Sequence, residues 1–260
     1  MRWGTLKRTI VIGPLIGMML ASLSGCTGIW TDGGQADSDA PAASGSATPG
    51  PKPELVLATA VIGLGKQNLK FTVDGGTGDV RSGSLDAASG AVKVTADVDG
   101  SPAELITYRD DIYIGGLRGD GKWLHARVPK FKDSAIPFVA TADPLFGARF
   151  LGSASDVQQG QPNTLSGTAD LTRVIASGTT QLIAHGFGKA AGTKATALPF
   201  TATVDDAGAL SAVNMVFPKA DRGKDLVYNL KITDVGGAVT ITVPAENETV
   251  PAPADLYTVP

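Results

Sequence analysis

One cysteine has a position that specifies chemistry more clearly than any other residue of the chain. Cys26 is the only cysteine among 260 residues, and it directly follows Leu23, Ser24 and Gly25. These four residues match a lipobox, in which an aliphatic residue and two small residues precede a cysteine. At such a site diacylglycerol alkylates the cysteine sulfur, and the peptide bond on the amino side of the cysteine is then cut. We therefore expect Cys26 to be lipidated. The alternative is an ordinary signal peptide with a cysteine there by chance.

The residues before the cysteine are typical of a signal peptide. Arg2, Lys7 and Arg8 form a basic start, and an apolar run follows over 9–23. A spanning helix needs about 20 such residues, so this shorter run fits the hydrophobic region of a signal peptide. We expect residues 1–25 to be removed. The mature chain would then begin at Cys26 with diacylglycerol, carrying acyl chains such as palmitate, on its sulfur.

Two acyl chains are enough for stable membrane anchoring. The expected location is therefore the extracytoplasmic face of the cell membrane, with the membrane contacted through the lipid anchor. Residues 27–52 consist mainly of Gly, Ala, Ser, Pro, Thr and Asp. Such a composition cannot bury enough apolar surface to fold. We predict that residues 26–52 are the lipidated cysteine and a flexible tether, with a reach of roughly 25–30 Å.

The charge of the chain argues against nucleic acid as a partner. Of the 22 basic residues, three lie in the signal peptide, which leaves 19 against 25 acidic residues and a net charge of −6. There is also no basic run with interleaved aromatic residues, which nucleic-acid-binding proteins commonly have.

The rest of the chain predicts an α+β domain over 53–250, followed by a C-terminal tail over 251–260. Pro53 and Glu54 favour the start of a helix, although the apolar run over 55–62 also fits a buried strand. A short helix is expected after Asp143, with this residue as its N-cap and Pro144 in its first turn, and a further weak helix over 177–187. About ten segments alternate apolar and polar residues between Gly and Asp turns, which predicts a large, curved antiparallel sheet. These expected strands are 69–74, 92–98, 105–108, 112–114, 122–128, 164–171, 198–204, 210–217, 226–232 and 239–243.

A search for catalytic or metal-binding motifs finds none that is convincing. His125 and His185 are the only histidines, and neither has a second metal ligand at helical or loop spacing. No nucleophile elbow or phosphate-binding loop is present. The paired acids at 110–111 and 205–206 are interpreted as turn residues. We expect no enzyme activity, no catalytic or metal site and no cofactor.

Several segments resemble the actinobacterial lipoprotein family of the LppX/LprAFG type, which includes LprG and has a fold similar to that of LolA. The matching segments are Gly83-Ser84-Leu85-Asp86, Lys122-Trp123-Leu124, Gly167-Thr168-Ala169-Asp170-Leu171, Leu198-Pro199-Phe200-Thr201, Asp205-Asp206-Ala207-Gly208-Ala209-Leu210 and the run over 234–245. Thr203 departs from the pattern, since several relatives have tryptophan there. The resemblance implies a strongly bent half-barrel closed by helices. It also implies an apolar cavity that binds acylated lipids or glycolipids. The protein would carry these lipids towards the cell envelope, with a membrane transporter as a possible partner.

Strand alternation suggests which side chains would line such a cavity. A dry apolar pocket stabilises a 16-carbon chain by roughly 12 kcal/mol, so lipid binding needs volume rather than a catalytic motif. The candidate lipid-binding residues are Leu69, Phe71, Val73, Val92, Val94, Ala96, Val213, Met215 and Phe217. Ordinary core packing explains the same pattern equally well. The alternative function is a surface lipoprotein with a packed core that mediates protein or cell-wall contacts.

Overall fold

The structure of the protein, a computed structural model, describes residues 50–75, 80–98, 101–175 and 177–258. These residues belong to one compact unit, Pro49–Pro260. Cys26, the signal peptide, most of the predicted tether and the turn residues 76–79 lie outside the described residues.

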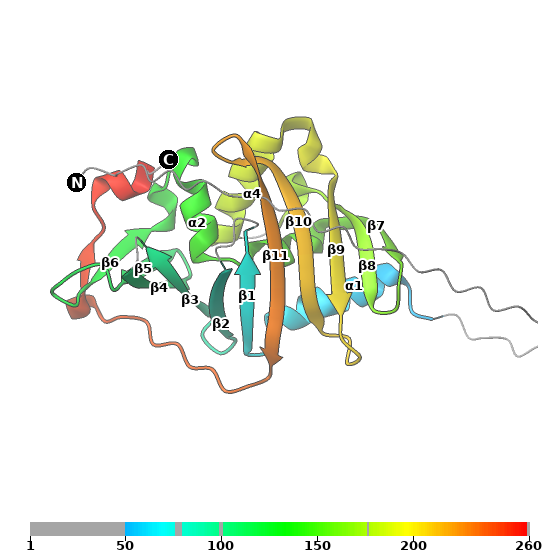
Figure 1. Ribbon diagram of the computed structural model, residues 1–260, viewed down its shortest axis with the longest axis horizontal. Helices are drawn as coiled ribbons and strands as arrows, with labels where there is room; N and C mark the ends of the chain where they lie inside the picture. Colours follow the sequence, from blue (N-terminus) through cyan, green and yellow to red (C-terminus); the bar gives the residue numbers. More distant parts are fainter. Residues whose placement is uncertain (1–49, 76–79, 99–100, 176, 259–260) are drawn as a thin grey trace, which may run out of the picture. The chain divides into compact units, whose positions relative to one another are not determined.

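The described part of the chain forms one twelve-stranded sheet beside four α-helices, which is an α+β fold (Figure 1). The strands follow the order β12-β6-β5-β4-β3-β2-β1-β11-β10-β9-β8-β7, and all neighbours are antiparallel except β12 and β6. Two meanders, β1–β6 and β7–β11, therefore meet where β1 pairs with β11. The strands are β1 Leu69–Asp74, β2 Val80–Asp86, β3 Ala91–Val98, β4 Ser101–Tyr108, β5 Asp111–Gly115, β6 Trp123–Arg127, β7 Ala154–Gln159, β8 Thr164–Ala169, β9 Leu198–Val204, β10 Leu210–Asp221, β11 Lys224–Val235 and β12 Thr249–Pro251.

The large antiparallel sheet is confirmed, but the strongly bent half-barrel is not. The sheet is open, since it ends at β12 on one side and β7 on the other, and it is not strongly curled. Helices pack against one face and supply the apolar side chains that bury it, so the sheet does not need to close on itself. At the β7 edge the register shifts between Ser155 and Gln158, and such a bulge discourages pairing with another strand.

Three strands were not predicted, and one prediction was wrong. β2, β7 and β12 are short or contain few apolar residues, so alternation gives little signal there. The segment 239–243 was expected to be a strand, yet it is extended without a sheet partner in the described structure. The segment still alternates apolar and polar residues, because Ile241 packs on Ala91 and Ile106. The Ile241 N–H contacts the Asp86 carboxylate, at 3.4 Å, instead of a strand.

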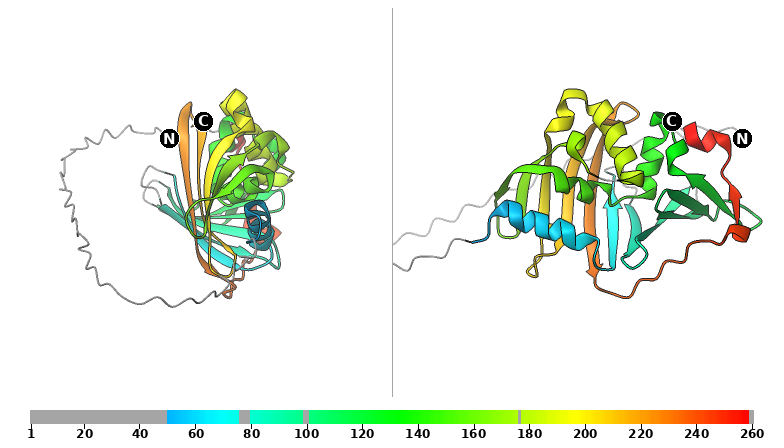
Figure 2. Two further views of the ribbon diagram at one scale, coloured as in Figure 1. Left: turned by 90° about the vertical axis from the view of Figure 1, so that its right-hand side faces the viewer. Right: turned by 180° about the vertical axis from the view of Figure 1, so that it is seen from behind.

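The four α-helices lie on one side of the sheet, here called the inner face (Figure 2). The prediction of a helix after Pro53 is confirmed by α1, and the weak helix after Ser177 by α4, which runs further than expected. The helices are α1 Pro53–Leu64, α2 Ile136–Ala142, α3 Phe146–Phe150 and α4 Gly178–Ala191. Short 3-10 turns occur at Val128–Lys130, Asp133–Ala135, Leu151–Ser153, Leu171–Arg173, Gly192–Thr196, Glu246–Glu248 and Ala254–Thr258.

The predicted capping role of Asp143 is wrong. Asp143 follows the last residue of α2, and α3 begins only at Phe146. Because α2 occupies the preceding residues, the backbone at Asp143 ends one helix rather than starting the next. Its side chain turns inward and accepts hydrogen bonds from Arg149 and Thr179. Asp143 therefore joins the end of α2 to α3 and to the start of α4.

Candidate functional site

The nine predicted lining residues all come from three strands of the sheet: β1, β3 and β10. Eight of them are buried, and Ala96 is partly buried against the same core cluster. Alternation therefore identified the inner face correctly. Their role in lipid binding remains a prediction, because these side chains pack in the protein core.

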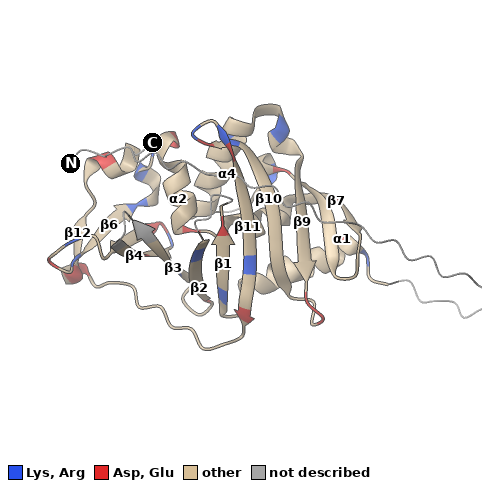
Figure 3. Ribbon diagram, viewed as in Figure 1, with Lys and Arg blue, Asp and Glu red and all other residues tan. Residues whose placement is uncertain are grey.

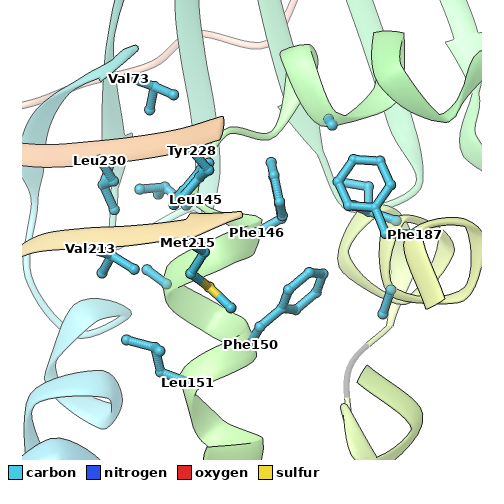
Figure 4. Close-up of a cluster of buried hydrophobic side chains, with 14 of the residues drawn as sticks. Val73, Leu145, Phe146, Phe150, Leu151, Phe187, Val213, Met215, Tyr228 and Leu230 are labelled. Atoms are coloured by element: carbon cyan, nitrogen blue, oxygen red, sulfur yellow. The ribbon is translucent and has the colours of Figure 1, made fainter. Parts of the chain in front are cut away.

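Aromatic side chains fill the interior above β10 and β11 (Figure 4). Phe146 and Phe150 come from α3, and Phe187 comes from α4. All three rings lie within 6 Å of the Phe217 ring, at centroid distances of 5.5, 5.9 and 5.1 Å. Tyr228 completes the cluster. Of the predicted lining residues, Phe217 is thus the one most directly enclosed by helical side chains.

Tyr228 is held in this cluster by a hydrogen bond as well as by packing. Its hydroxyl donates to the Pro144 carbonyl oxygen at 2.6 Å, and burial raises the pKa of the phenol. The backbone of α3 passes very close to the ring: a Cβ atom at Gly147 would lie 2.5 Å from it. Only glycine therefore allows α3 to approach the sheet at this point.

An apolar groove beside this cluster lies between α2, α4 and the β10–β11 hairpin. Its volume is about 460 Å³, which is within the usual range for small-molecule sites. Apolar atoms dominate its walls, and charged residues lie along its rim. The groove is lined by Asp133, Ser134, Ile136, Pro137, Gly186, Phe187, Lys189, Ala190, Lys219, Ala220, Arg222 and Gly223.

The shape of the β10–β11 hairpin places its residues in the groove. Asp221 pairs with Lys224, which leaves a two-residue turn of Arg222 and Gly223, both with positive φ. Such turns match the twist of the strands they join. A register shift after Phe217 and a positive φ at Lys219 bend β10 before the turn. Figure 3 shows basic and acidic residues together at this end of the hairpin.

The opposite wall of the groove is formed where α2 and α4 touch. A Cβ atom at Gly186 would lie 2.6 Å from the Ile136 side chain, so glycine permits the close contact between these helices. At the rim, the Lys189 ammonium lies 2.5 Å from an Asp133 carboxylate oxygen. This hydrogen bond and the lysine charge lower the pKa of Asp133.

A second, smaller groove of about 160 Å³ borders the other side of α2. Pro137 lines both grooves, and the second one reaches Val73, Phe146 and Tyr228. Arg81 donates a hydrogen bond to the Thr141 hydroxyl at 2.7 Å across it. The seven-residue helix α2 therefore separates two openings that both lead to the aromatic cluster.

A buried carboxylate lies at the end of α2. The Asp143 side chain is 1% exposed, and its Oδ2 accepts hydrogen bonds from Arg149 and Thr179, each at 2.5 Å. Thr180 lies 3.4 Å from the same oxygen, whereas Oδ1 has no hydrogen-bond partner. Asp143 does not line either groove. We interpret it as a structural link between three helices.

The opposite, outer face of the sheet carries a histidine cluster that sequence reasoning missed. His125 Nε2 lies 2.7 Å from Asp111 Oδ1, and Arg127 Nε lies 3.1 Å from the same oxygen. The His125 ring also stacks on Tyr113, with centroids 4.8 Å apart. Asp111 was interpreted as a solvated turn residue, but β5–β6 pairing places it beside His125 and Arg127. In the described ranges, no group of three or more His, Cys, Asp or Glu residues could hold a metal.

His185 and the other acidic pair have simpler surroundings. His185 is exposed and lines two grooves along α4, with volumes of about 410 and 520 Å³. Asp205 accepts hydrogen bonds from the backbone N–H groups of Ala207 and Ala209, at 3.0 and 2.8 Å. Its interpretation as a turn residue is confirmed.

No protein-family model matches the chain, and no curated protein sequence matches it. None of the helices in the described part of the chain has the length and apolar character needed to cross a bilayer.

Proposed function

We propose that this protein is a lipid-anchored, extracytoplasmic lipoprotein that binds an acylated lipid or glycolipid. The proposed site is the groove between α2, α4 and the β10–β11 hairpin. Diacylglycerol on Cys26 would hold the protein at the membrane, as the lipobox predicts. The resemblance to LppX/LprAFG-type proteins, with their LolA-like fold, is part of this proposal. It is supported by the sheet with helices on one face.

The observation that carries the proposal is the position of Phe187. This side chain lines the groove, and its ring also lies 5.5 Å from Phe146 and 5.1 Å from Phe217. An acyl chain that enters the groove therefore meets a surface continuous with the core. Rotation of Phe187 would let the chain extend towards the predicted lining residues on β10. Transfer of each methylene group out of water contributes about 0.8 kcal/mol.

The rim of the groove favours an anionic or polyhydroxylated head group. Lys189, Lys219 and Arg222 all line it, and Asp133 is the acidic residue among the lining side chains. Lysine and arginine bind phosphate and carboxylate oxygens through charge-assisted hydrogen bonds. The mouth of the groove would then select the head group, while its apolar walls supply most of the affinity.

Native mass spectrometry of the compact unit, residues 49–260, tests lipid binding. We expect co-purified acyl lipid after gentle extraction. Replacement of Ala190 by Trp would fill the groove and reduce lipid occupancy severalfold. The matched control is Thr193→Trp, an exposed site near the end of α4 that does not line the groove. Absence of lipid from the unmodified protein, or equal occupancy in both variants, would count against the proposal.

The packing of the predicted lining residues favours a second candidate function. Since these side chains are buried in a continuous core, the domain could instead act as a rigid surface module for protein or cell-wall contacts. This alternative requires no lipid cargo. It predicts that gentle extraction yields lipid-free protein and that cross-linking on the outer surface captures a partner.

A further inference from the structure

Helix α1 exposes large apolar side chains to solvent. Leu55 and Ile62 are 63% and 61% exposed, which is unusual for residues of this size. Ala58 and Thr59, one turn from each of them, are also exposed. Residues spaced in this way share one side of a helix, so Leu55, Ala58 and Ile62 form an apolar stripe beside the Thr59 hydroxyl, here called the α1 stripe.

The opposite side of α1 is buried, so the stripe is not required for folding. Leu57, Ala60 and Leu64 pack into the core, and α1 contacts β7 and β10. A surface helix normally has polar residues on the side away from the core. Glu54 is the only charged residue in α1, and no described element is seated on Leu55 or Ile62.

The position of α1 in the chain indicates what contacts the stripe. The helix begins at Pro53, directly after the predicted tether over 27–52, so an anchor on Cys26 would keep α1 close to a bilayer. Exposed lysines flank the helix at Lys52 and Lys66. Lysines in these positions can extend towards phospholipid phosphates while the apolar side chains enter the interface.

We propose that the α1 stripe docks in the head-group region of the membrane that holds the anchor. This inference rests on the lipid anchor of the proposed function, but not on a lipid cargo. Two large apolar side chains bind a membrane weakly by themselves. Tethering raises their effective concentration at the surface, so docking becomes favourable only in the anchored protein. Docking would hold the domain in one orientation rather than leaving it free above the bilayer.

Fluorescence quenching on the full-length lipidated protein tests the docking. The sulfur of Cys26 is consumed by the anchor, so a cysteine introduced at Ala58 offers a single thiol for an environment-sensitive NBD label. The protein is reconstituted in phosphatidylcholine–phosphatidylglycerol vesicles that carry nitroxide-labelled acyl chains. We expect a blue shift of the emission and severalfold stronger quenching than at Thr201→Cys. Thr201 is an exposed residue of β9 on the outer face.

A double variant then tests whether the apolar side chains cause the docking. Leu55→Gln with Ile62→Gln should reduce quenching at position 58 to the level at position 201, without changing the melting temperature, because both side chains are exposed. Equal quenching at the two positions in protein that floats with vesicles would overturn the proposal. The proposal would also be overturned if the blue shift of the label at position 58 occurred only after a protein extract is added, since a protein would then cover the stripe. Failure to float would instead contradict the anchor itself, and lipid occupancy in native mass spectrometry is unaffected by either result.

Discussion

The inner face of the sheet and the outer face over β3–β6 are both apolar, but they are covered differently. Four helices cover the inner face, with three phenylalanines from α3 and α4 packed on Phe217. The outer face is covered by the extended segment around Ile241, which packs on Ala91 and Ile106. The inner cover is a layer with its own secondary structure, whereas the outer cover is a single strap.

This difference shows which parts of the molecule can open independently. The outer strap forms no strand in the described structure, and its opening would expose only the small cluster of Ile241, Ala91 and Ile106. The inner helices share one continuous core, so opening there disturbs many contacts, and fewest where it is confined to the seven-residue helix α2. Regions with few buried contacts open at the lowest free energy. Opening confined to the short helix α2 should therefore cost less free energy than separation of the whole helical layer.

The largest expected effect comes from truncation of the inner aromatic cluster. Phe217→Ala removes a ring that packs against four others and should lower the free energy of unfolding by about 4 kcal/mol. Ile241→Ala in the outer cluster should cost about 2 kcal/mol, because fewer neighbours surround the removed atoms. Chemical denaturation of both variants, with Thr201→Ala as an exposed control, measures the difference. Equal losses would show that the two covers are energetically equivalent.

The next effect concerns the polar link within the inner layer. Asp143→Ala leaves the Thr179 hydroxyl without its acceptor and the Arg149 guanidinium with the Thr180 hydroxyl in place of a carboxylate, and we expect a loss of about 3 kcal/mol. Thr179→Ala removes one hydrogen bond to the carboxylate and should cost about 1.5 kcal/mol. Guanidinium denaturation checks both values. If Asp143→Ala proves neutral, the three helices do not depend on this link, and packing alone holds the inner layer.

Sequence patterns predicted the faces of the molecule better than its sites. Alternation placed Phe71, Val94 and Met215 on the inner face because strand side chains repeat every two residues. The same rule could not reveal that Asp111 meets His125, since this contact depends on the register between β5 and β6. Register requires knowledge of the turn between the strands, and the connection over 116–122 is longer than the two-residue turns that fix a register despite its Asp120-Gly121 pair.

The candidate groove was unpredictable for a related reason. It depends on the bulge after Phe217 and on the contact between Gly186 and Ile136, which are separated by 50 positions in the chain. The short helix that carries Phe146 and Phe150 was expected after Asp143. What it lacked was the unpredicted helix α2, which changes the role of Asp143 and forms one wall of the groove.

The smallest expected effect on stability comes from Asp133, the exposed acid of the inner layer, in contrast to the buried Asp143. Lys189 holds the pKa of Asp133 below its ordinary value, so the ionised carboxylate is favoured in the folded state. Its contribution to stability is therefore present above the ordinary pKa of aspartate and is lost as the pH falls through the lowered value. Because both side chains are more than half exposed, water screens the pair, and the effect on melting temperature should be small.

An NMR titration of the Asp133 carboxyl carbon checks this prediction. In Lys189→Gln the midpoint should move up towards the ordinary aspartate value, whereas Lys194→Gln, an exposed lysine beyond the end of α4, should leave it unchanged. If the midpoint does not respond to Lys189→Gln, the ion pair at the groove rim does not form in solution. Lys189 would then be available to an anionic head group without first breaking a contact to Asp133. The rim of the groove would in that case be an open cationic surface. It would not hold an ion pair that resembles, in weaker form, the buried contact between Asp143 and Arg149.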